Sequence, residues 1–396
     1  GVNVLIDKFL PRRDWLNQLK WRGSWSVVGN PIPNTLFARQ SYDFSNGTIS
    51  TRPPLFDDPQ PETTTSFETG LDVWMFENKF NFDLTYYNST LRNQFLYVTT
   101  ANGESKPVNT GKIRNYGLEF QASYRWNINK DWRWQTGFNI AWNDNRILET
   151  YKTESGAPYE VQMGPNAFKI KYVEGGRYGD IYVNSFARDE NGHIKINDAG
   201  NYENAVPVMA SGKYETKVGN MTSPVTLGWN NTFTWKNFTL YFLIDGRIGG
   251  KVMSLTEADL DLYGLSERSA QDRLNGERVM QNGKEYILKP LPDGSGNKVS
   301  VENYYTTIGA LPMEDHVYNA TSLRMRDISL SYDMPNLFGK NQGMTAQFSV
   351  KNAFFIYKDS PVDPDISVSA ANGYSGIDCY SLPTTRSFAL TLKFNF

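Results

Sequence analysis

The chain has 396 residues and a formal net charge of −2, and 14% of its residues are aromatic. Its basic and acidic residues are interspersed, which excludes the basic footprint of a nucleic-acid-binding protein. Its one cysteine, Cys379, excludes an internal disulfide, and no stretch approaches the roughly 18–20 apolar residues of a membrane-spanning helix.

Alternating apolar and polar residues predict about ten β-strands. Successive side chains of a strand point to opposite faces, so a period of two gives one apolar face and one polar face. Residues 238–244 read Phe-Thr-Leu-Tyr-Phe-Leu-Ile, with Phe242 on the apolar face and Thr239 on the other. In chain order, the predicted strands cover residues 15–28, 65–76, 79–98, 112–128, 132–145, 222–236, 238–250, 322–333, 344–354 and 386–396.

One predicted strand changes phase. Leu323 and Met325 occupy odd positions, whereas Ile328 and Leu330, further along the same strand, occupy even ones. An extra residue in one strand of an antiparallel pair produces such a slip. We therefore expect a β-bulge near Arg326–Asp327.

Strand and loop lengths favour a membrane barrel over a soluble β-protein. Many predicted strands have 12 residues or more, whereas globular strands have about five or six and about 9–11 cross a bilayer. Two predicted loops exceed 60 residues, which is uncommon in a compact domain. Short turns alternate with long loops, as in outer-membrane barrels. We predict an all-β fold, an antiparallel transmembrane β-barrel with extracellular loops at 29–64, 99–111, 146–221, 251–321 and 355–385.

The loops show no pattern that indicates catalysis. Both histidines, His193 and His316, fall in predicted loops without a Ser/His/Asp arrangement or a Gly-rich phosphate motif. Residues 189–192 and 293–297 are similar to calcium loops but lack the terminal bidentate Glu, so turn chemistry explains both. Residues 255–275 are compatible with a helix. We expect no enzymatic activity, no metal and no cofactor.

Several motifs lie in matching order along the whole chain. The clearest is Ser322–Tyr332, which reads Ser-Leu-Arg-Met-Arg-Asp-Ile-Ser-Leu-Ser-Tyr. The others are Gly111–Glu119, Glu68–Asp72 followed by Asp83–Tyr87, Asp245–Gly250, Val362–Asp365 and Leu382–Phe388. Together these segments resemble the SusC/RagA-like branch of the TonB-dependent outer-membrane transporters.

The resemblance implies that residues 1–396 are the C-terminal portion of a longer barrel. Members of that branch carry a signal peptide, a TonB box, a plug and a barrel of about 22 strands. About ten strands, and no plug, TonB box or signal peptide, are expected within this chain. Ten strands alone form an open arc with unpaired edges, which are costly in hydrocarbon. We therefore expect an N-terminal portion to close the wall.

The resemblance also implies a function and partners. The complete protein would import oligosaccharide or peptide nutrients across the outer membrane, with TonB–ExbB–ExbD acting through the missing N-terminal part. A SusD-like surface lipoprotein would cap the outer loops, lipid would surround the wall, and nucleic acid is no partner. The alternative is a surface adhesion barrel that binds ligand without transporting it. That alternative predicts no plug upstream.

Aromatic residues of the predicted outer loops are candidate substrate-binding residues. Tyr304, Tyr305, Tyr374 and Tyr380 lie in such loops, and loops on a rigid scaffold often carry function. Their rings could stack on sugar faces or on peptide side chains. Packing within the loop, or contact with a lid protein, is the alternative interpretation.

Two further groups have candidate roles on the strands. Phe394 and Phe396 resemble the aromatic signal that the barrel-assembly machinery reads, and the alternative is that they only face lipid. Inward polar residues, such as Glu119, Arg125, Asp245 and Arg247, could line a pathway. Ion pairs with the plug or with a neighbouring strand explain them more readily.

Overall fold

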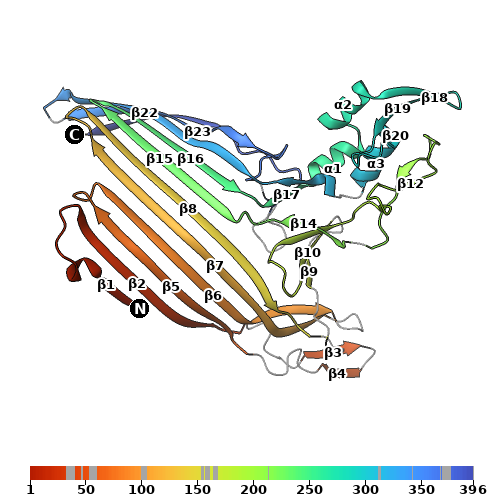
Figure 1. Cartoon of the computed structure of the whole chain (residues 1–396), viewed down its shortest axis with the longest axis horizontal. Coiled ribbons are helices and arrows are strands. Elements are labelled where there is room, and N and C mark those ends of the chain that lie inside the picture. Colours follow the sequence, from red (N-terminus) through yellow and green to blue (C-terminus); the bar gives the residue numbers. More distant parts are fainter. Residues whose placement is uncertain are drawn as a thin grey trace.

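The computed structural model describes the chain except for residues 33–40, 46–47, 53–59, 100–104, 153–155, 157–160, 164–167, 213, 311–313, 341, 366, 368–375 and 396. Its dominant feature is one antiparallel sheet of 11 strands in the order β1-β2-β5-β6-β7-β8-β15-β16-β22-β23-β25. Figure 1 shows these long strands side by side, with the loops gathered at one end. The strands are β1 (Val2–Leu5), β2 (Leu16–Asn30), β5 (Glu62–Met75), β6 (Phe80–Thr99), β7 (Ser105–Asn127), β8 (Trp132–Glu149), β15 (Val225–Trp235), β16 (Phe238–Ile248), β22 (Ser322–Gly339), β23 (Gln342–Lys358) and β25 (Ser387–Asn395).

All ten predicted strands are confirmed, and two of their predicted boundaries are wrong. The long loop predicted at 99–111 is shorter, because β6 and β7 stay paired as far as Thr99 and Ser105. The turn predicted at 335–343 is largely strand, because β22 and β23 pair again at Gly339 and Gln342. Pro and Gly indicated a loop at both places, but pairing with the neighbouring strand prevails. The short edge strand β1 was not predicted.

The β-bulge is confirmed at Arg326. On β16, Ile244 lies opposite Met325 and Leu243 lies opposite Asp327, so Arg326 is the extra residue. The pairing of β22 with β23 shifts at the same position. The bulge explains the phase change in the sequence, because one unpaired residue reverses the faces of all that follow.

The two faces of the sheet differ in chemistry. Directly opposite residues on seven neighbouring strands form an apolar row, in which Leu240 and Phe348 are exposed on the face of the sheet. The row consists of Trp126, Trp134, Phe233, Leu240, Leu330, Phe348 and Leu390. A polar row crosses the other face and consists of Lys20, Asp72, Asp83, Gln121, Asn139, Gly228, Asp245 and Arg324. A sheet with one apolar and one polar face suits a wall between lipid and water.

The sheet forms part of a barrel wall and does not close on itself. Among the described residues, β1 and β25 each pair with one neighbour only and do not pair with each other. Both edges therefore present backbone groups that a complete wall would pair.

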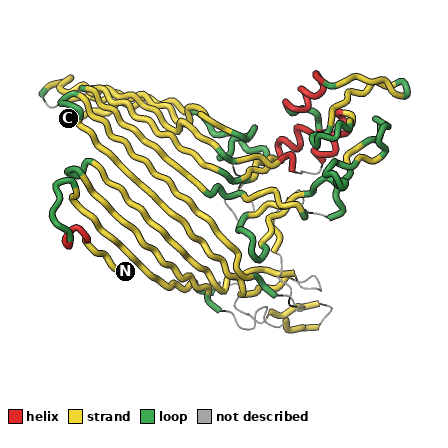
Figure 2. The backbone as a smooth tube through the Cα atoms, in the orientation of Figure 1, coloured by secondary structure: helices red, strands yellow, loops and turns green. Residues whose placement is uncertain are grey.

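The long connections form a folded layer at one end of the sheet (Figure 2). Helices α1 and α2 confirm the helix-compatible run at 255–275, whereas α3 was not predicted. No helix among the described residues is long and apolar enough to cross a membrane. The helices are α1 (Leu255–Leu262), α2 (Glu267–Asn275), α3 (Val301–Ala310) and the 3-10 turns Ile6–Phe9 and Glu314–His316. The short strands are β3 (Ser41–Ser45), β4 (Thr48–Arg52), β9 (Val161–Met163), β10 (Lys169–Tyr172), β11 (Asp180–Val183), β12 (Ile196–Asn197), β13 (Val206–Pro207), β14 (Thr216–Asn220), β17 (Lys251–Ser254), β18 (Glu277–Gln281), β19 (Lys284–Pro290), β20 (Lys298–Ser300), β21 (Val317–Asn319) and β24 (Ile377–Asp378).

Two apolar clusters hold this outer layer together. The first packs Ile170 and Ile181 of one long loop against Met253 and Ile377 of two others. The second packs Phe186 and neighbouring residues against α3. Residues from three separate connections thus share buried contacts, so these three loops form one body at the end of the sheet.

A glycine on the polar face gives a test of how closely the strands pack. A Cβ at Gly117 would lie 2.5 Å from the hydroxyl of Tyr87 and 2.5 Å from the backbone oxygen of Trp142. The Tyr87 ring crosses Gly117 so that its hydroxyl accepts a hydrogen bond from Asn143 at 2.6 Å. We expect Gly117→Val to cost about 1–3 kcal/mol through overpacking, measured as unfolding of the protein in detergent. The control is Gly29→Val, where the nearest atom lies 4.0 Å away. Equal losses in the two variants would contradict this packing.

Candidate functional site

Ion pairs join different strands on the polar face, and one of them spans the strand between its partners. Lys20 on β2 pairs with Asp72 on β5 at 2.6 Å, and Arg22 on β2 donates to Asp83 on β6 at 2.7 Å. Each pair links different strands, so these four charges are compensated within the wall. The sequence alone suggested such pairs for inward-facing polar residues.

The densest group of charges lies where the polar face meets the outer loops. Arg247 comes from β16, Arg324 and Arg326 come from β22, and Asp363 and Asp365 come from the loop after β23. Arg324 pairs with Asp363 at 2.6 Å, and Arg326 pairs with Asp365 at 2.7 Å. Arg247 pairs with the other oxygen of Asp365.

This group also settles how two inward polar residues are paired. Asp245 on β16 accepts from Arg326 on β22 at 2.7 Å, as predicted for a neighbouring strand. Arg247 instead contacts an outer loop, since it pairs with Asp365 and donates to the carbonyl of Pro364 at 3.0 Å. The sequence did not single out this contact, although both partners fall in motifs that it did single out.

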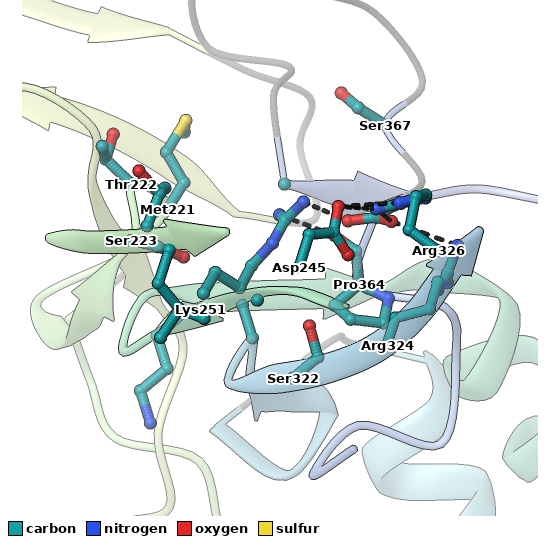
Figure 3. A pocket seen from close by; sticks show the side chains of 17 residues that line it. Met221, Thr222, Ser223, Asp245, Lys251, Ser322, Arg324, Arg326, Pro364 and Ser367 are labelled. Atoms are coloured by element: carbon teal, nitrogen blue, oxygen red, sulfur yellow. Dashed lines mark hydrogen bonds and ion pairs between the residues drawn. The ribbon is translucent and has the colours of Figure 1, made fainter. Parts of the chain in front are cut away.

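A cavity of about 510 Å³ opens beside these charges. Ser223, Thr226 and Ser322 contribute hydroxyl groups to its lining, and Arg247 and Arg326 contribute charge. Figure 3 shows Asp245, Arg324, Arg326 and Pro364 gathered on one side of it. A second cavity, of about 450 Å³, also includes Arg324 in its lining. Both cavities lie where the strands meet the outer loops, and charged and apolar side chains line them together.

Asp363 is fixed more firmly than Asp365. The side chains of Arg324 and Asp363 are only 3% and 6% exposed, and Thr384 also donates to Asp363. Burial raises the pKa of Asp363, but the hydrogen bonds from Arg324 and Thr384 outweigh it and hold the pKa below the ordinary carboxyl value. Asp363 is therefore ionised at neutral pH and holds its loop against β22.

The loop layer contains a buried polar network that has no catalytic arrangement. Asp261 on α1 accepts hydrogen bonds from Ser266 at 2.5 Å and from Arg268 at 3.1 Å, and it contacts Nε2 of His316 at 2.8 Å. The serine and the histidine thus both bond to the carboxylate. In a Ser/His/Asp triad the histidine would stand between the two. The network holds α1, α2 and the turn before β21 together.

Two of the four candidate tyrosines are buried. Tyr304 and Tyr305 on α3 are each 3% exposed. The hydroxyl of Tyr304 donates to Asp315 at 2.6 Å, that of Tyr305 donates to Asp272 at 2.7 Å, and burial raises the pKa of both phenols. The Nζ of Lys289 lies 4.1 Å and 4.7 Å from the two ring centroids. The rings belong to the core of the loop layer, as the alternative interpretation held, and are not available to a ligand.

The remaining candidates have different surroundings. Tyr380 is 63% exposed and has a φ of 52°, and its N–H donates to Thr256 at 2.8 Å. Phe394 lies on β25, and the centroid of its ring is 6.0 Å from that of Phe338. Tyr374 and Phe396 lie outside the described residues. Of the four candidate tyrosines, Tyr380 is therefore the one described residue with a solvent-exposed ring.

Among the side chains that the structure describes, no group of three His, Cys, Asp or Glu residues is placed to hold a metal ion.

Comparisons with known proteins match this architecture. The family model described as "TonB dependent receptor-like, beta-barrel" matches residues 7–353. TonB-dependent receptor P3 of Formosa agariphila is 23% identical over 435 residues, which cover 100% of this chain and 41% of that protein. TonB-dependent receptor SusC of Bacteroides thetaiotaomicron is 24% identical over 428 residues, which cover 100% of this chain and 39% of that protein.

A solved structure shares the fold. The RagAB peptide importer in its "open-open" state superposes with a TM-score of 0.70 at 17% identity, covering 100% of this chain and 42% of that one. This chain thus spans about two fifths of the length of the relatives it matches. The matched family and the two-faced sheet agree, and the chain belongs to the TonB-dependent receptor-like β-barrel family of the outer membrane.

Proposed function

We propose that the complete protein imports oligosaccharide or peptide nutrients across the outer membrane. The observation that carries the proposal is the two-faced sheet, with an apolar row across seven strands on one face. The other face carries paired charges. Such a sheet separates lipid from an aqueous lumen, and membership of the family supports passage through that lumen.

In this proposal the chain is the C-terminal portion of the barrel and contributes wall and outer loops. Strands outside residues 1–396 pair with the open edges of β1 and β25, and a plug fills the lumen. TonB–ExbB–ExbD delivers energy through that other part of the protein. The open edges and the two-fifths coverage of the relatives support this division.

A SusD-like surface lipoprotein is the proposed partner of the outer layer. Tyr263, Leu265 and Leu274, in and around α1 and α2, are large apolar residues with most of their surface exposed. Monomeric surfaces seldom expose many such side chains together, so a partner that covers them would be stabilising. The name of SusC among the relatives supports the same partnership.

Tyr380 and Tyr374 remain the proposed ligand contacts among the tyrosines. The exposed ring of Tyr380 and its left-handed backbone, which is uncommon for a tyrosine, support its role. Phe394 and Phe396 remain the proposed assembly signal of the last strand.

The proposal is tested in the bacterium that encodes the protein. Cells that lack the complete gene are compared with wild-type cells for uptake of fluorescently labelled oligosaccharides and peptides, before and after the proton-motive force is dissipated. We expect uptake of one of the two classes to fall both in the deletion strain and in de-energised wild-type cells. Surface binding that is lost without any change in uptake would instead show an adhesion barrel and overturn the proposal.

A further inference from the structure

One carboxylate of the last outer loop is surrounded by three arginines. Asp365 lies 2.7 Å from Nη2 of Arg326 and 3.2 Å from Nη1 of Arg324, and its other oxygen pairs with Arg247. Guanidinium groups offer paired donors that match the geometry of a carboxylate. Three of them around one carboxylate form a binding site, which the chain fills with its own side chain.

The architecture of the wall explains why the three arginines converge. Arg324 lies opposite Asp245 on the polar face, and Arg247 is two residues further along β16 on the same face. Arg326 is two residues after Arg324, so alternation along β22 places it on the same face. As the extra residue of the bulge it has no partner on β16, and its guanidinium pairs with Asp245 and Asp365.

The site is open to the cavity on one side. The side chains of Arg247 and Arg326 are 33% and 31% exposed, and both line the cavity of about 510 Å³ together with Asp365. Arg324 and Asp363, beside them, are almost fully buried. The side chain of Asp365 is 16% exposed and lines the same cavity, whereas Asp363, at 6%, is a buried anchor.

Charge balance makes the site depend on its carboxylate. Three arginines face three aspartates, Asp245, Asp363 and Asp365, at this end of the sheet. Without Asp365 one positive charge of this group is left uncompensated beside the cavity. An anion that replaces the carboxylate restores the balance, and unpaired charge that is partly shielded from water is costly.

We propose that Arg247, Arg324 and Arg326 form a carboxylate-binding site at the outer end of the lumen face, and that Asp365 occupies it as an exchangeable internal ligand. A solute that carries a carboxylate, whether an acidic sugar or an acidic peptide, displaces Asp365 and frees that part of the last outer loop from β16 and β22. Asp363 keeps the loop attached during the exchange. The site does not depend on whether the complete protein transports its ligand.

The first experiment asks whether the arginines bind a carboxylate in place of Asp365. The full-length protein and its Asp365→Gly variant are treated with phenylglyoxal, and modification of Arg247 and Arg326 is followed by peptide mass spectrometry. Loss of a charge-assisted contact worth about 1 kcal/mol corresponds to about a fivefold rise in modification rate. Sodium acetate is expected to restore protection in the variant, whereas acetamide, or sodium chloride at equal ionic strength, is not.

A matched control removes a different carboxylate from the same loop. Asp359 accepts a hydrogen bond from Asn319 at 3.0 Å. In the described part of the chain the three arginines pair with Asp245, Asp363 and Asp365 and not with Asp359, so Asp359→Gly should leave their modification unchanged. Asp365→Asn keeps the shape of the side chain and should behave as Asp365→Gly does. If acetate protects the variant no better than chloride, or if the arginines react equally fast in the wild type, the proposed site is refuted.

The second experiment asks whether a solute displaces Asp365 in the wild type and which source of carboxylate acts. Galacturonate and a short glutamate-containing peptide are titrated separately, with galactose and the glutamine-containing peptide as neutral partners. Amide hydrogen exchange across residues 359–365 should rise with the acidic member of one pair and not with its neutral partner. If neither acidic solute raises exchange, Asp365 is a permanent strap and the exchange is refuted.

Discussion

Replacement of Phe242 by arginine is expected to destabilise the barrel by about 2–4 kcal/mol, the cost of a cation facing lipid near the bilayer midplane. Phe242 lies on the apolar face of β16, opposite Asn231 on β15 and Ile328 on β22. The centroid of its ring lies 5.8 Å from that of Trp229 and 6.3 Å from that of Phe233. The change therefore removes aromatic packing and also places charge in hydrocarbon.

The matched control lies on the other face of the same strand. Thr239→Arg introduces the same charge three residues away, next to Thr234 and Ser331, where the lumen supplies water. We expect a much smaller loss from it. Both variants of the full-length protein are unfolded reversibly with denaturant in the presence of lipid, followed by tryptophan fluorescence. Similar losses in the two would show that the faces are assigned the wrong way or that neither faces lipid.

Replacement of Asp261 by alanine is expected to cost about 3–5 kcal/mol locally, because it leaves buried charge without its partner. The Asp261 side chain is fully buried and pairs with Arg268 and His316. The same carboxylate accepts a hydrogen bond from the hydroxyl of Ser266, the residue that caps α2. The loss should therefore spread through α1 and α2 and leave the strands of the wall unaffected.

Hydrogen exchange resolves this difference between layer and wall. In Asp261→Ala we expect faster amide exchange in α1, α2 and α3 and unchanged exchange in β15 and β16. Asp259→Ala removes a carboxylate from the same helix outside this network and should change little. A uniform rise across the sheet would contradict the idea that the loop layer unfolds separately.

The contribution of Asp261 to the stability of the loop layer is expected to fall in acid. Burial raises the pKa of Asp261, but the hydrogen bonds from His316, Arg268 and Ser266 outweigh it and hold the pKa below its ordinary value. A carboxyl group with a lowered folded pKa stabilises the native state above its unfolded pKa, and this stability is lost as the pH falls through the folded pKa. The loop layer should thus loosen in acid, between the ordinary carboxyl pKa and the lowered one.

The main strands could be predicted from the sequence because alternation is a local property. In a strand between lipid and water, the apolar and polar side chains must alternate every two residues. Even the β-bulge at Arg326 is visible in the sequence, as a change of phase in this pattern. Strand ends were less predictable. Pro107 and Gly111 indicate a loop by composition, yet the pairing of β6 with β7 continues through them, and that pairing depends on the neighbour.

The candidate ligand residues show what sequence reasoning could not separate. Tyr304, Tyr305 and Tyr380 all lie in outer loops, but two are buried and one is exposed. Burial in a loop layer depends on contacts between distant segments. Phe186, for example, packs its ring 6.4 Å from that of Tyr304, and no local pattern records this contact.

The sequence by itself determined the class of protein, the number and order of the main strands, and which side chains share a face, because all of these follow from periodicity and from motifs in chain order. Only the tertiary structure decided which charges meet. Arg247, Arg326 and Asp365 are far apart in the chain, and they converge because strand register and the return of the last outer loop bring their side chains to one place.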